Sequence, residues 1–264
     1  MNLTDDQLDR YARHIVLREV GGQGQKKLLQ SKVLIVGAGG LGSPLLLYLA
    51  AAGVGTIGVI DDDKVDLSNL QRQIAHGTAD IGHAKVTSAA EAIAAINPDV
   101  EIIQHEMRLT AGNIAEIFAN YDLVADGTDN FETRYLVNDA CFFFKKPLVA
   151  AAMLQFEGQL STFRAFEEGN NPCYRCLFPS APPPEIAQTC GEAGVLGALA
   201  GAMGSLQAVE ILKELLSIGE SLSGRLLMYD ALTSEFQKMK IKRDPACTLC
   251  GETPTITDMP FHSG

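Results

Sequence analysis

Positive charge is scarce in this sequence of 264 residues, which has 21 lysines and arginines against 32 aspartates and glutamates. The formal net charge is therefore −11. Proteins that bind nucleic acid derive much of their affinity from lysine and arginine contacts to phosphates, so this balance argues against a nucleic-acid partner. The hydrophobic fraction of 47% is enough for a buried core and excludes an intrinsically disordered chain.

The sequence also lacks a recognisable leader and a long uninterrupted apolar run. Acidic residues are spread through residues 1–20, which is the opposite of the basic and then apolar pattern of a signal peptide. The most apolar stretch, residues 194–216, is broken by glycines and by charged residues such as Glu210 and Lys213. This stretch predicts a buried helix and no membrane span, and we expect a cytoplasmic protein.

The order of apolar patterns predicts an α/β fold. A continuous apolar strand at 33–36 leads through a glycine turn into a helix at 43–52, and a second strand follows at 56–60. Helices and strands then alternate, which predicts a Rossmann-like, doubly wound and mostly parallel sheet. The remaining helices are expected at 4–20 (with Thr4 as N-cap), 84–96, 113–119, 131–144 and 194–216, and the remaining strands at 100–104, 122–126, 147–152, 159–166, 225–229 and 235–240.

The glycine turn has the spacing of a nucleotide-binding loop. Gly37–Gly42 reads G-x-G-x-x-G between a strand and a helix, where glycine lets backbone amides approach a phosphate. Asp61, at the end of the next strand, is placed to bind ribose hydroxyls. By itself this motif fits NAD, FAD or ATP, and a purely structural turn is a further alternative.

Two cations and one acid favour a triphosphate over a dinucleotide. Arg72 lies in the polar stretch 66–73, and Lys85 begins the next helix; both suit the neutralisation of charge on a departing pyrophosphate, although each alone is also typical of a solvated surface. Asp129 follows a predicted strand and is a candidate Mg²⁺ ligand. Its alternative is the N-cap of the helix at 131–144.

Four of the six cysteines form two Cys-x-x-Cys pairs, Cys173 with Cys176 and Cys247 with Cys250. Such pairs present thiolates to a tetrahedral zinc ion, and the long separation predicts a structural ion that fastens the C-terminal part of the chain to the fold. Unrelated core cysteines or redox pairs are the alternative. Cys141, on the apolar face of a predicted helix, is expected in the core.

In their order and spacing these residues closely resemble the bacterial E1-like adenylyltransferases that activate ubiquitin-like sulfur-carrier proteins in molybdopterin and thiamin-thiazole biosynthesis. The resemblance covers almost the whole chain. The residues that carry it are Arg10–Arg13, Gly37–Gly42, Asp61, Ser68–Gln73, Lys85, Thr128–Asn130, Cys173–Cys176 and Gly204–Ala208. One departure is His14, where the family often has glutamine.

The resemblance implies that ATP is attacked at its α-phosphate by the C-terminal glycine carboxylate of a carrier with a Gly-Gly tail, giving an acyl-adenylate and pyrophosphate. It also implies a homodimer in which Arg13 crosses to the partner's ATP, and a Mg²⁺ ion on Asp129. The residues implied to bind the nucleotide are Gly39, Gly40, Asp61, Asn69, Arg72, Lys85, Asp129 and Asn130.

On the same basis we expect one domain, with a helical arm (1–30), a nucleotide-binding half (31–152) and a carrier- and zinc-binding half (153–264). The ending 243–257 favours the molybdopterin branch over the thiazole branch, and a separate sulfurtransferase or cysteine desulfurase is expected to supply sulfur. Cys190 matches a position where some family members carry a reactive thiol; it is equally consistent with a small loop hydrophobe. An NAD- or FAD-dependent oxidoreductase and a noncatalytic docking protein are the alternatives from other classes.

Overall fold

A single eight-stranded sheet organises the chain in the computed structural model, which describes residues 3–183 and 193–259. The strand order is β3-β2-β1-β4-β5-β6-β7-β8. From β3 to β5 the strands are parallel, and from β5 to β8 each pairs antiparallel with the next. The bounds are β1 Lys32–Val36, β2 Thr56–Ile60, β3 Glu101–His105, β4 Leu123–Asp126, β5 Leu148–Leu154, β6 Glu157–Phe163, β7 Arg225–Asp230 and β8 Glu235–Lys240.

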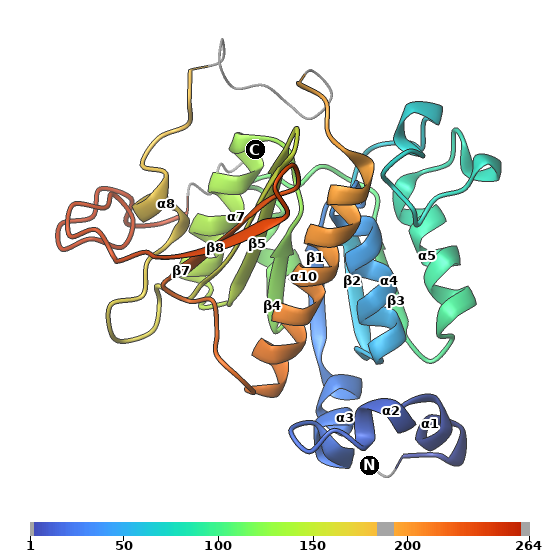
Figure 1. Cartoon of the computed structure of the whole chain (residues 1–264). Helices are drawn as coiled ribbons and strands as arrows, with labels where there is room; N and C mark the ends of the chain where they lie inside the picture. Colours follow the sequence, from blue (N-terminus) through green and yellow to red (C-terminus); the bar gives the residue numbers. More distant parts are fainter. Residues whose placement is uncertain (1–2, 184–192, 260–264) are drawn as a thin grey trace.

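Helices cover both faces of this sheet, as predicted for a doubly wound fold (Figure 1). One face carries α4 (Gly42–Ala52), α5 (Lys85–Ile96) and α10 (Gly197–Leu216), and the other carries α6 (Ile114–Phe118) and α7 (Phe131–Phe143). The strand β1 feeds both cores, because Val33 and Ile35 face one side and Leu34 and Val36 face the other. Burial on both faces explains why the central strands are continuously apolar in the sequence.

The N-terminal arm departs from the predicted single helix at 4–20. Thr4 does cap α1 (Asp5–Arg10), but the chain bends at Tyr11 before α2 (Ala12–Ile15). The Tyr11 ring is buried against Gly53, and its hydroxyl accepts a hydrogen bond of 2.8 Å from Asn97. This anchoring holds Tyr11 outside helical geometry, with φ −100° and ψ 12°.

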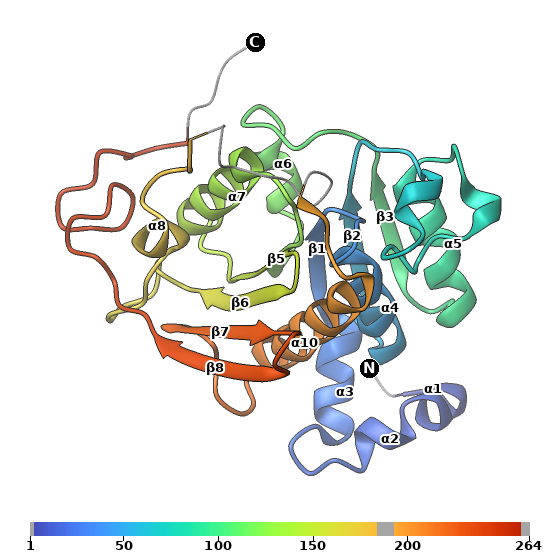
Figure 2. The ribbon, with the colours of Figure 1, turned by 45° about the horizontal axis from the view of Figure 1, so that its top comes forward.

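A further helix, α3 (Gly21–Gln30), lies within the predicted helical arm (1–30), although a specific helix was expected only at 4–20. Three of its residues are glycines, which disfavour an isolated helix by about 1 kcal/mol each relative to alanine. Packing overrides this preference, since Leu28 is fully buried and α3 contacts α10. Figure 2 shows the arm below α4 and α10, at the end of the sheet where β1 begins.

Among the helices that the structure describes, none combines the length and apolarity needed to cross a bilayer.

Candidate functional site

A cavity of about 590 Å³ lies at the carboxyl ends of the parallel strands. It opens where the strand order reverses, with the loop after β1 on one side and the loop after β4 on the other. Open α/β sheets bind their ligands at this switch point. All eight residues expected to hold the nucleotide line it: Gly39, Gly40, Asp61, Asn69, Arg72, Lys85, Asp129 and Asn130.

The glycine loop is shaped by close backbone contacts. Gly37 takes a positive φ of 96°, and a Cβ on Gly42 would lie 2.0 Å from the carbonyl oxygen of Gly37. A side chain is therefore excluded at Gly42. Among the described residues, the N–H groups of Gly39, Gly40 and Leu41 have no hydrogen-bond acceptor. Together with the N-terminus of α4, they form a concentration of free donors suited to an anion.

Asp61 lies on the other side of this loop. Its Oδ2 accepts the N–H of Ala38 at 2.8 Å, and its Oδ1 accepts the N–H of Asp63 at 2.9 Å. Burial raises the pKa of Asp61, although Lys85 and the two N–H donors act to lower it. Each oxygen retains a lone pair for another donor, as a ribose hydroxyl would require.

The basic residues predicted from the polar stretch do meet at the cavity. The side chain of Lys85 is only 7% exposed, and its Nζ donates to Asp63 Oδ2 at 2.8 Å. Arg72 follows a short 3₁₀ turn (Leu67–Asn69) and donates to the carbonyl of Ser68 at 3.1 Å. Two cations from different elements therefore line one cavity.

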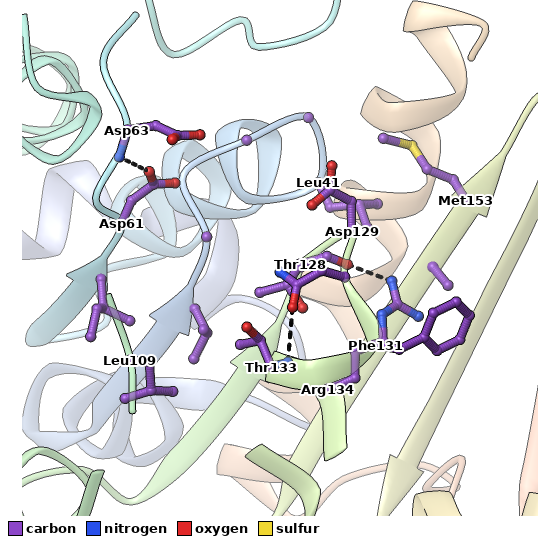
Figure 3. Close-up of a pocket in the computed structure, with 18 of the residues that line it drawn as sticks. Leu41, Asp61, Asp63, Leu109, Thr128, Asp129, Phe131, Thr133, Arg134 and Met153 are labelled. Carbon is purple, nitrogen blue, oxygen red and sulfur yellow. Dashed lines mark hydrogen bonds between the residues drawn. The ribbon is translucent and has the colours of Figure 1, made fainter. Parts of the chain in front are cut away.

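At the end of β4 the structure separates two roles that the sequence had left open. The N-cap of α7 is Asn130, whose Oδ1 accepts the N–H of Thr133 at 2.9 Å. Asp129 is exposed at the cavity and makes no hydrogen bond or ion pair with any described residue. Its carboxylate is therefore free for a cation, and oxygen ligands of this kind suit Mg²⁺. Figure 3 shows Asp129 between the Asp61 side of the pocket and the Arg134 side.

Arg134 is a cavity residue that the sequence reasoning missed. It is 9% exposed, and its Nη2 donates to the carbonyls of Thr128 at 2.5 Å and Ala151 at 3.4 Å. Burial acts against its charge, but the buried carboxylate of Asp126 prevails and raises the pKa of Arg134. Arg134 therefore fixes the loop that carries Asp129. An arginine inside a predicted helix gives no sign in the sequence that it faces a cavity.

The cavity wall beyond Arg134 is aromatic, with Tyr174 and Phe178 in contact at 4.9 Å between ring centroids. Tyr174 begins α8 (Tyr174–Leu177), and Asn138 on α7 accepts its backbone N–H at 2.8 Å. The sequence reasoning missed this wall as well, because it assigned 173–176 only to metal binding.

The four paired cysteines converge, as predicted. The Sγ atoms of Cys173, Cys176, Cys247 and Cys250 all lie within 4.8 Å of one another. Three of the separations are 3.9, 3.5 and 3.3 Å, close to the ~3.8 Å between thiolates on a tetrahedral zinc and far beyond the ~2.05 Å of a disulfide. Without an ion, hydrogen bonds from neighbouring sulfurs and burial raise the pKa of the Cys173 thiol, so a cation is needed for all four to ionise. The cluster fits zinc.

Two predicted residues, Arg13 and Cys141, lie away from the cavity. Arg13 is exposed on the arm, which packs at the opposite end of the sheet from the cavity. Cys190 lies outside the described residues. Cys141 is buried in the core, as expected, and burial raises its pKa well above the ordinary value.

Together the cavity offers free N–H donors, four lysine or arginine side chains (Arg72, Lys85, Arg108 and Arg134), a ribose-type acid and an unpaired carboxylate. This set suits a nucleoside triphosphate, and transfer of its nucleotidyl group needs alignment and charge neutralisation more than an enzyme nucleophile.

Comparison with known proteins gives a consistent picture. The model of the ThiF family matches residues 11–249. The chain is 49% identical over 261 residues to the sulfur carrier protein adenylyltransferase of Thermus thermophilus, covering 98% of this chain and 96% of that protein. It is 49% identical to adenylyltransferase and sulfurtransferase MOCS3 of Anopheles gambiae, but spans only 58% of that protein.

Among solved structures, E. coli MccB crystallised with AMPCPP and MccA has the same fold. The TM-score is 0.79 at 20% identity, covering 95% of this chain and 75% of MccB.

Proposed function

Because the chain belongs to the ThiF family, we propose that it adenylates the C-terminal carboxylate of a ubiquitin-like sulfur carrier with a Gly-Gly tail. It is an adenylyltransferase by its similarity to named adenylyltransferases, and it therefore uses ATP. The observation that carries the proposal is the single cavity in which the glycine loop, Asp61, Arg72, Lys85 and Asp129 meet.

In the proposed reaction a carboxylate oxygen of the carrier attacks the α-phosphorus of ATP, and the bond to the bridging oxygen of pyrophosphate breaks. The free N–H groups of the glycine loop hold the phosphates, and Asp61 holds the ribose. Arg72 and Lys85 neutralise charge that builds on the leaving pyrophosphate. A Mg²⁺ ion on Asp129, when bound, would supply further neutralisation of the phosphates.

The carrier tail is proposed to reach the phosphates past Arg134 and Met153, which lie across the cavity from Asp61 (Figure 3), and past Tyr174, which also lines the cavity. An apolar surface adjoins this end: Leu154, Phe156, Leu196, Leu232 and Phe236, each at least 41% exposed. Backbone hydrogen bonds join its parts, from Leu196 to Gln155 and from Ala231 to Phe156. Exposed apolar groups beside a cavity are typical of a protein-binding surface, and we place the body of the carrier here.

A homodimer would explain the location of Arg13. In its own chain it cannot reach the cavity, whereas the arm of a second copy could bring it there. The exposed Tyr48 (57%) and Val209 (54%) lie on the adjacent helices α4 and α10. They support an interface on this face.

The ending 243–257 favours a molybdopterin carrier, with the thiazole carrier as the alternative. A separate sulfurtransferase or cysteine desulfurase is proposed to supply sulfur, since none of the described thiols lines the cavity. The chemistry needs ATP and reduced thiols, as provided by the cytoplasm.

ATP/pyrophosphate exchange tests the proposal. The purified protein with Mg²⁺ is mixed with a molybdopterin-type or a thiazole-type carrier, each intact or without its terminal glycine. We expect exchange only with an intact tail, and the better carrier identifies the pathway. Absence of exchange with every carrier, from folded protein that contains zinc, would contradict the function, and binding of NAD(H) would then favour an oxidoreductase.

A further inference from the structure

His76 is buried beneath the glycine loop and plays no part in the reaction described above. It is 7% exposed, and its Nε2 lies 3.0 Å from the carbonyl oxygen of Ala38, the second residue of the loop. On the other side, its Nδ1 lies 2.8 Å from Ser88 Oγ on α5. The imidazole thus connects the loop after β1 with a helix on the far side of the polar segment 61–82.

The proton positions follow from the partners. A carbonyl can only accept, so Nε2 must carry a proton to bond Ala38. Burial lowers the pKa of His76, and the neutral ring then has no second proton for Nδ1, which can only accept a hydrogen bond and has the Ser88 hydroxyl as its neighbour. That hydroxyl also lies 2.9 Å from Asp80 Oδ2, and its single proton can serve either acceptor.

This hydrogen bond determines which way a peptide plane faces. The described chain has no cis peptide bond, so the Ala38 carbonyl and the Gly39 N–H point in opposite directions across their shared plane. The carbonyl points down to His76, and the Gly39 N–H therefore points away from the protein interior, toward the cavity that Gly39 lines. Asp61 holds the preceding plane through the Ala38 N–H.

We propose that His76 is a positioning residue for nucleotide binding: it fixes the Ala38–Gly39 peptide so that the Gly39 N–H is presented to a phosphate group of ATP. The inference rests on the proposed function only in taking ATP as the ligand. Gly39 has the backbone freedom to let the Ala38–Gly39 peptide plane rotate. Without His76 the Gly39 N–H can therefore turn away from the phosphate, although no residue in contact with ATP has changed.

The test compares the affinities of ATP and adenosine, measured by calorimetry on the full chain without carrier. For His76→Ala we expect ATP binding weaker by about tenfold, the worth of one hydrogen bond to a charged acceptor, and adenosine binding within about twofold of the wild type, since adenosine has no phosphate. His76→Gln places an amide donor near the position of Nε2 and should restore most of the ATP affinity.

Equal losses for ATP and adenosine would overturn the inference, since they would indicate general damage to the site, and so would an unchanged ATP affinity. Where His76→Ala does not fold, Ser88→Ala replaces it. Loss of the Ser88 hydroxyl permits the tautomer that has no proton on Nε2, and we expect a loss of about threefold for ATP alone. A wild type that binds ATP without adenylating any carrier would contradict the proposed function and leave this comparison intact.

Discussion

Replacing Lys85 by methionine should abolish most of the activity at little cost in stability. In the ligand-free protein the Lys85 ammonium pairs with Asp63 at 2.8 Å, but the Asp63 side chain is 68% exposed. A pair with one solvated partner contributes about 0–1 kcal/mol. Methionine fills a similar volume and removes a buried charge, so the free energy of unfolding should change by less than about 1 kcal/mol.

In Lys85→Met the transition state of adenylation loses more stabilisation than the folded protein does. A hydrogen bond from the ammonium to phosphate oxygen contributes about 1.5–3 kcal/mol, which corresponds to a fall of about 10- to 150-fold in rate. The assay is carrier-dependent pyrophosphate release at varied ATP, with urea unfolding in parallel. Asp63→Asn is the matched control, because it removes the partner and keeps the ammonium, and it should retain activity within about threefold. If Lys85→Met keeps its rate while the control loses it, the pair is structural and the assignment of Lys85 to catalysis is wrong.

Three further results are expected. Gly42→Ala, whose Cβ would meet the Gly37 carbonyl at 2.0 Å, should destabilise the fold by about 1–3 kcal/mol and abolish ATP binding. Gly22→Ala, whose Cβ would have nothing within 4 Å, should neither destabilise the fold nor weaken ATP binding. Equal melting temperatures for the two variants would contradict this account of the loop. Purified protein should contain one zinc per chain by metal analysis, and Cys247→Ser should lose the zinc and melt at lower temperature; full stability without metal would show that the cluster is no ion site. Burial raises the pKa of Asp126 above 3.8, so the folded state holds this proton more tightly. The contribution of protonated Asp126 to the free energy of unfolding is fully present below pH 3.8 and is lost as the pH rises through the raised pKa. Asp126→Asn should remove that loss in urea unfolding between pH 4 and 7, and an unchanged pH profile would refute the assignment.

The central fold could be predicted because its signals are local. The strand β2 was predicted at its observed bounds, since a short apolar run between Gly55 and the acidic residues 61–63 has few other interpretations. The arm could not be predicted in the same way. The bend at Tyr11 depends on Asn97 and Gly53, which are distant in the sequence. The helix α3 forms despite the low helix propensity of its glycines, because it packs on α10.

The site shows the same division. The glycine loop, Asp61 and the cysteine pairs carry their chemistry in their spacing, and the structure brings each group together. Arg134 lies inside a helix with no motif around it, and only the tertiary fold turns it toward the cavity. The choice between cap and ligand at Asp129 also required the fold, because adjacent residues in the sequence compete for the same cap.

The cysteine cluster and the cavity share a wall, which would give a bound ion a role beyond stability. Tyr174 lies between Cys173 and Cys176, so an ion bound by these cysteines would also fix the aromatic ring that lines the cavity. The same short helix is held to α7 by the paired Arg175 and Asp139, at 2.7 Å. Since α7 begins beside Asp129, the two sides of the proposed tail channel are attached to one helix. A loose C-terminal segment would release that wall, so under the proposed function a zinc ion at the cluster would preserve the channel for the carrier tail.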